Sequence, residues 1–192
     1  MAALEPDRLY ENFGWLSLPP IQCRVYLVWS LIEVGAFAEG IAHGDEAIRL
    51  AEATDRPYER LTTYIRASTL HLRQGDVHQA TALLERSLSL IQAADLSTSY
   101  ILAAAPLAAA YARCGQTAEA LPLVKQVVVG APSTFVCLFC IEAYLLAGHV
   151  EEASQLALSH PLSRARAQRT GPRGMGALAP RRHRHTSRAP GD

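Results

Sequence analysis

The sequence predicts an all-α fold, a right-handed helix-turn-helix solenoid of about four helix pairs. Four glycines, Gly35, Gly75, Gly115 and Gly148, each separate two apolar runs, and the segments around them resemble one another. They recur with a period of roughly 33–40 residues, which is typical of stacked helical repeats. Alanine and leucine, which favour helix, are abundant, and hydrophobic residues make up 49% of the 192-residue chain.

Eight helices are expected, two around each of these turn glycines. Apolar side chains recur at the i, i+3, i+4 spacing of a helix that buries one face, as Leu84, Leu88 and Ile91 illustrate. The expected ranges are about 21–34, 37–53, 59–73, 77–94, 100–113, 117–129 and 134–147, with a last helix starting near 150.

The chain divides into three segments by composition. Residues 1–20 contain several proline and glycine breakers and are expected to form a loop that leads into the first helix. The repeat domain is expected over residues 21–159. Residues 160–192 leave the helical pattern and contain eight arginines and one acid, although the whole chain has 18 basic and 18 acidic residues.

Two interpretations of residues 160–192 stay open. The first is a disordered basic tail that contacts anionic partners. The second is an out-of-frame translation, because GC-rich DNA translated out of frame yields arginine, proline, glycine and alanine. One coding of the string TGPRGMGA, shifted by one base, gives RGHEAWAL, which is similar to the first helix of a further repeat.

Composition excludes several classes of function. The first residues carry acids and no apolar signal-peptide core, and no apolar stretch reaches the ~18 residues of a membrane span, so a cytoplasmic protein without a membrane partner is expected. The segment before residue 160 has 17 acids and 10 basic residues. Its net negative charge opposes phosphate groups, so we expect no nucleic-acid partner.

No pattern of catalytic or metal-binding residues is present. Cys137 and Cys140 have a C-x-x-C spacing, but no second ligand pair follows and the surrounding segment is predicted to be a buried helix, so buried structural thiols are expected. The histidines lack metal-ligand spacing, and no phosphate-binding loop or nucleophile motif occurs. The sequence therefore predicts a protein that is not an enzyme and has no cofactor or metal.

The residues around the turn glycines resemble the tetratricopeptide repeat over about residues 21–158. Only glycine or alanine lets two helix axes approach to ~8–10 Å. In register with the turn glycines, the crossing positions carry Gly40, Ala80, Ala120 and Ala153. Tyr111 and Tyr144 match the aromatic near the end of the first helix, and Pro132 matches the proline that closes a repeat.

A narrower resemblance is carried by three strings, FAEGIAHGDEAIRLAEATDRPY, LRQGDVHQATALLERSL and EAYLLAGHVEEASQLA. They are similar to the C-terminal repeat region of bacterial signalling proteins that carry an adenylate/guanylate cyclase domain and an AAA-type ATPase domain. The chain contains no G-x-x-x-x-G-K-[ST] loop, so neither activity is expected here.

In such repeats the first helix of each pair lines a concave groove that binds a protein or peptide. We therefore expect a protein-interaction scaffold. The alternative is a detached or truncated regulatory fragment without independent function, and self-association through an incomplete last repeat is a further possibility. The groove-facing positions, taken from the glycine register, are Gln22, Val25, Trp29, Glu33, Thr62, Ile65, Thr69, Arg73, Leu102, Ala105, Ala109, Arg113, Phe135, Leu138 and Glu142.

Overall fold

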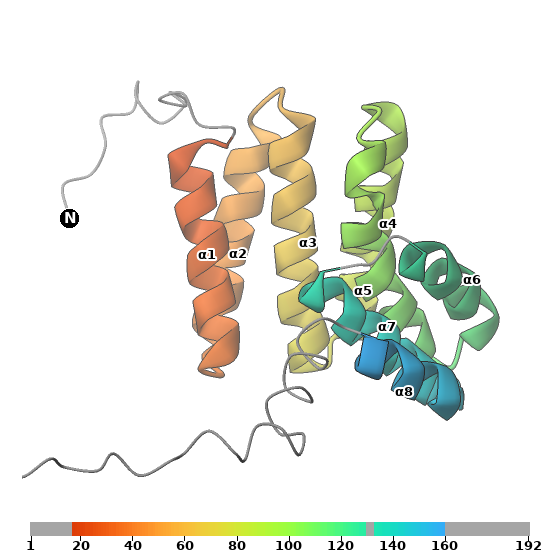
Figure 1. Ribbon diagram of the computed structural model, residues 1–192. Coiled ribbons are helices and arrows are strands. Elements are labelled where there is room, and N and C mark those ends of the chain that lie inside the picture. Colours follow the sequence, from red (N-terminus) through yellow and green to blue (C-terminus); the bar gives the residue numbers. More distant parts are fainter. Residues whose placement is uncertain (1–16, 130–132, 160–192) are drawn as a thin grey trace, which may run out of the picture.

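The computed structural model describes residues 17–129 and 133–159, and within them the fold is an all-α solenoid of four helix pairs (Figure 1). The predictions for the basic tail and for most of the N-terminal loop concern residues outside these ranges. The helices are α1 (Pro19–Glu33), α2 (Phe37–Glu52), α3 (Pro57–Gln74), α4 (Val77–Ala93), α5 (Tyr100–Arg113), α6 (Thr117–Val128), α7 (Thr134–Leu146) and α8 (Val150–Ser159), with a short 3-10 turn, η2 (Ser97–Ser99).

The expected helix boundaries are confirmed to within two residues. The largest differences lie at the starts of α1 and α3, which begin at Pro19 and Pro57 rather than after them. Proline fixes φ near the helical value and lacks only an N–H that the first turn leaves unpaired, so it starts a helix well. Pro19 was expected as a breaker in the loop over residues 1–20, and Pro57 was expected to precede the third helix; both assignments were wrong.

The four turn glycines share one backbone geometry. Their φ angles are +75°, +98°, +76° and +80°, in the left-handed region that favours glycine. In each turn the residue after the glycine donates its N–H to a carbonyl five positions earlier in the first helix, for example Asp76 to His71 and Gln116 to Tyr111. This cap ends the first helix and reverses the chain, so each glycine creates one helix pair.

Small residues lie where the two helices of each pair cross. Ala80 and Ala120 are fully buried, and Gly40 and Ala153 are buried as well. A Cβ atom added at Gly40 would lie 3.1 Å from the Leu70 Cδ1 atom, which is closer than most contacts of that kind. Leu70 belongs to α3 of the next pair, whereas the Leu31 Cβ atom of the paired helix α1 would lie 3.6 Å from the added Cβ. The predicted crossing positions are therefore buried in all four pairs, and Gly40 is packed against two helices.

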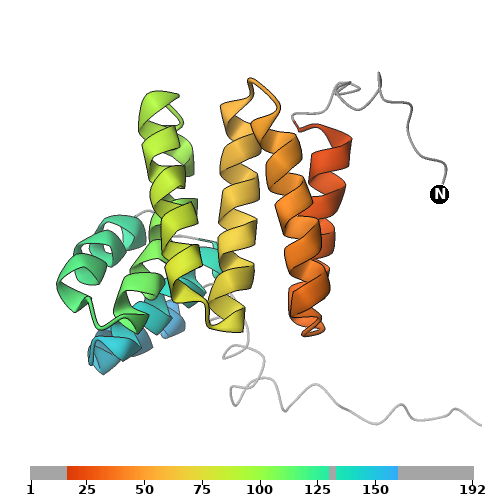
Figure 2. The ribbon, with the colours of Figure 1, turned by 180° about the vertical axis from the view of Figure 1, so that it is seen from behind.

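The pairs stack in chain order. Figure 1 shows α1, α2 and α3 side by side, with α4 beside α3 and the later helices turned relative to the first three, and Figure 2 shows the same order from behind. Helix α5 lies in the centre, where residues 103–110 are all buried despite a proline at position 106. The largest apolar cluster runs from α3 to α8 through this helix.

A carboxyl group lies buried at the N-terminal end of α3. Glu59 is 1% exposed, and its Oε1 atom accepts a hydrogen bond of 2.6 Å from the Leu18 backbone N–H. Its Oε2 atom has no hydrogen-bond partner among the described residues. Burial raises the pKa of this carboxyl above 4.5, although the Leu18 N–H and Arg56 lower it.

Replacing this glutamate by glutamine is expected to stabilise the protein at neutral pH. A carboxyl whose pKa is raised by folding destabilises the native state increasingly as pH rises from about 4.5 through the folded pKa. Glu59→Gln should therefore raise the free energy of unfolding by about 1 kcal/mol at pH 7, with a smaller gain at pH 4. Urea denaturation at both pH values measures this. Exposed Glu151→Gln serves as the control, and an equal gain in both variants would contradict the explanation.

Candidate binding pocket between three first helices

Three first helices, α1, α3 and α7, enclose a pocket of about 300 Å³. Apolar and aromatic side chains form most of its wall, and charged groups lie among them. The lining residues are Trp29, Ile32, Glu33, Arg66, Thr69, Arg73, Thr134, Phe135, Leu138, Phe139 and Glu142.

Helical spacing places these residues on the inner face of each helix. The α3 residues are three and four positions apart, as expected for one face of a helix. Helix α7 reaches the pocket because its Phe135 packs against the cluster formed by Leu61, Ile65, Ile91 and Ala103. The first turn of α7 thus closes the space between α3 and α1.

A cation–aromatic stack crosses the pocket. The Arg66 Cζ atom lies 4.2 Å from the Trp29 ring centroid and 5.0 Å from the Phe135 ring centroid. The two rings are 6.3 Å apart, and Phe135 in turn meets Phe139 edge-on at 5.1 Å. This stack therefore joins α1, α3 and α7, which belong to the first, second and fourth helix pairs.

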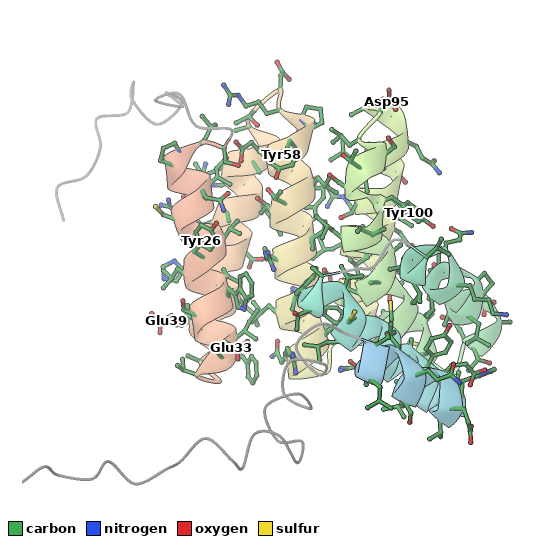
Figure 3. The ribbon with its side chains drawn as sticks, in the orientation of Figure 1. Tyr26, Glu33, Glu39, Tyr58, Asp95 and Tyr100 are labelled. Carbon is green, nitrogen blue, oxygen red and sulfur yellow. The ribbon has the colours of Figure 1, made fainter. Side chains whose placement is uncertain are left out.

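Some of the charged side chains at the pocket form ion pairs and others do not. Arg113 lies 2.5 Å from the Glu142 carboxylate and also donates to the Leu72 carbonyl, so Glu142 is neutralised. Arg66 has no ion pair and no hydrogen bond among the described residues. Burial lowers the pKa of the Arg66 guanidinium, while Tyr26 and Tyr58 raise it. Figure 3 shows Tyr26 and Glu33 along α1 and Tyr58 at the upper end of α3.

Seven of the positions expected to face the groove line this pocket, and an eighth, Arg113, pairs with one of them. The seven are Trp29, Glu33, Thr69, Arg73, Phe135, Leu138 and Glu142.

Four of the expected positions are buried in the core instead. Val25 is 2% exposed, Ile65 is 4% exposed, and Ala105 and Ala109 are fully buried. Three of them, Val25, Ile65 and Ala105, lie ten residues before a turn glycine and pack between neighbouring pairs. A partner cannot reach these side chains in this structure.

The other three expected positions lie away from the pocket. Gln22 is half-buried, and Leu102 packs partly buried against the core. The Thr62 hydroxyl donates within its own helix, with the Tyr58 and Glu59 carbonyl oxygens as acceptors.

Four residues that line the pocket were not among the expected positions, namely Ile32, Arg66, Thr134 and Phe139. Two of these, Arg66 and Phe139, lie nine residues before a turn glycine. The expected groove-facing residues Ile65 and Leu138 lie ten residues before the same glycines. Positions nine and ten residues before the glycine both lie three or four residues from positions thirteen and six, so helical spacing alone does not choose between them. Arg66 therefore could not be identified from the spacing.

The cysteines form no metal or redox site that the structure describes. Cys137 and Cys140 are buried and are not joined by a disulfide, and burial raises the pKa of both thiols, that of Cys140 to about 12. A thiol with a raised pKa is a poor nucleophile and metal ligand. In the described ranges no group of three or more potential metal-ligating side chains occurs, and no helix has the length and hydropathy to cross a membrane.

The glycine-capped pairs and small crossing residues define a tetratricopeptide-like helical repeat fold. Two solved structures are similar to the chain over 79% of its length. One contains nearly identical TPR-like repeats from a kinesin light chain candidate of Podosopora anserina, with 18% identity, 99% of that chain covered and a TM-score of 0.37. The other is a single-substitution variant of that protein, with 17% identity, 98% coverage and a TM-score of 0.36. No protein-family model and no curated protein sequence matches the chain.

Proposed function

We propose that the protein is a non-catalytic interaction scaffold that holds a peptide segment of a partner protein in the pocket between α1, α3 and α7. The observation that carries this proposal is the convergence of exposed apolar and charged side chains from three first helices on one concavity. Leu138 is 55% exposed there and Trp29 is 38% exposed.

The composition of the pocket suits a peptide. Binding sites combine an apolar wall with a few placed polar groups, and tryptophan and arginine contribute most to protein interfaces. This pocket offers Trp29 and two arginines, Arg66 and Arg73, around an apolar wall. Its volume of about 300 Å³ accommodates one or two side chains rather than a folded domain.

Selection of peptides tests the proposal. A phage-displayed library of random twelve-residue peptides is panned on the wild-type chain, on Leu138→Glu and on Leu158→Glu. Leu138 lines the pocket, whereas Leu158 is 71% exposed on α8 and lies outside it. Enriched peptides should bind the wild type and Leu158→Glu alike and lose at least about tenfold in affinity for Leu138→Glu, because a charge at this position opposes apolar contact. Failure to enrich any peptide, or equal binding to both variants, would refute the pocket as the site.

A second candidate is that the repeats are the C-terminal region of a larger cytoplasmic cyclase–ATPase signalling protein. Exposed leucines in the last pair support it. Leu138 and Leu145 lie ten and three residues before their turn glycine and are 55% and 51% exposed, whereas the same positions of earlier pairs are buried. A following repeat or domain would cover them. Sequencing the locus tests this, since the candidate requires an adjoining reading frame that encodes cyclase and ATPase domains.

A further inference from the structure

The pocket holds a cation that has no ion pair among the residues that the structure describes. Arg66 is largely covered, and its guanidinium lies over the faces of Trp29 and Phe135. Aromatic faces attract a cation, but they accept no conventional hydrogen bond from its edge. The N–H donors of the Arg66 guanidinium have no acceptor among the described residues, so they are available to a ligand.

The other charged groups of the pocket leave a positive excess. Arg73 also lines it, and no ion pair or hydrogen bond of Arg73 is present among the described residues. Of the two lining carboxylates, Glu142 already pairs with Arg113. Glu33 is therefore the one lining carboxylate in the described ranges that is left to balance Arg66 and Arg73.

We propose that this pocket recognises an acidic side chain of a partner peptide, with Arg66 as the residue that binds its carboxylate and the apolar wall binding a neighbouring apolar side chain. The inference rests on the proposed peptide-binding function and specifies its ligand. A carboxylate accepts two parallel hydrogen bonds from a guanidinium, which fixes its orientation as well as adding affinity. The stack on Trp29 and Phe135 holds Arg66 in place before the ligand arrives, so little side-chain freedom is lost on binding.

The experiment uses peptides enriched on the wild-type chain from the random twelve-residue library. We expect these peptides to contain Asp or Glu next to an apolar residue. Replacing that acid by Asn or Gln in the synthetic peptide should weaken binding at least about tenfold, because a charge-assisted bidentate contact is lost. Arg66→Gln should cause a similar loss for the acidic peptide and little change for its amide form.

A matched control separates Arg66 from arginine stacking in general. Arg86 also stacks on an aromatic ring, at 4.5 Å from the Tyr64 centroid, but it lies outside the pocket and pairs with Glu52 at 2.6 Å. Arg86→Gln should leave peptide affinity unchanged. Circular dichroism shows whether Arg66→Gln folds. If it does not, binding of the acidic peptide and of its amide form to the wild type is compared at low and at high salt. The carboxylate inference predicts that salt weakens the binding of the acidic peptide and not that of the amide form.

The outcomes are distinguishable. Peptides without an acid preference, or an acidic peptide unaffected by Arg66→Gln, would overturn the carboxylate inference while leaving peptide binding intact. If no peptide is enriched, or if Leu138→Glu binds peptides normally, the peptide-binding function at this pocket fails and the inference fails with it.

Discussion

Ala120→Trp is expected to destabilise the protein by about 1–3 kcal/mol or more. Ala120 is fully buried where α5 and α6 cross, and a tryptophan there would force the two helices apart. The same reasoning applies to Ala80 at the crossing of α3 and α4. Chemical denaturation followed by circular dichroism measures the effect as a lower midpoint.

The control for this substitution lies in the same helix. Ala118 is exposed two positions earlier in α6, so Ala118→Trp changes helix propensity and composition by the same amount without entering the crossing. We expect its free energy of unfolding to stay within about 0.5 kcal/mol of the wild type. If Ala118→Trp and Ala120→Trp destabilise equally, close packing at the crossing is not what holds the pair together.

Local signals explain why the helices could be predicted from the sequence. A left-handed glycine ends each first helix, and small residues five positions later fix how the second helix packs against it. Both signals act within one pair and depend on few residues. The prolines at the starts of α1 and α3 are local as well, and their role was misjudged because proline both starts and breaks helices.

The pocket depends on contacts that no local pattern contains. Trp29 and Phe135 are more than a hundred positions apart in the chain and meet only because the stacked pairs curve. The curvature is the sum of small rotations between pairs, which side-chain volumes across several interfaces determine. Sequence reasoning could therefore identify most of the inner-face residues, but it could not predict that those of α7 lie against those of α1.

The structure was also needed to decide which of two adjacent residues on a first helix faces the groove. Val25 and Tyr26 are adjacent, and both are compatible with an inner-face position on α1. The structure places Val25 in the core with Leu18 and Leu50, whereas Tyr26 is 56% exposed. A rotation of the helix by one residue decides which of the two side chains a partner can reach.

Leu72→Glu is expected to unfold the protein or to destabilise it by several kcal/mol, whereas Leu145→Glu is expected to change its stability by no more than about 0.5 kcal/mol. Both leucines lie three residues before a turn glycine, so they occupy the same place in their repeats. Leu72 is 1% exposed because the next helix pair covers it, and Leu145 is 51% exposed. Urea denaturation of the two variants measures the difference.

Leu145→Glu should also reduce self-association. Exposed apolar side chains at the end of a repeat array promote contact between copies, and Leu145 lies with Leu146 and Val150 among the large hydrophobic residues that are about half exposed. Sedimentation velocity over a range of concentrations should show a larger associated fraction for the wild type than for Leu145→Glu. Equal association of the two proteins would mean that this face does not mediate it. Strong destabilisation by Leu145→Glu would show instead that the leucine is covered in solution, so that the last pair is already capped by another part of the protein.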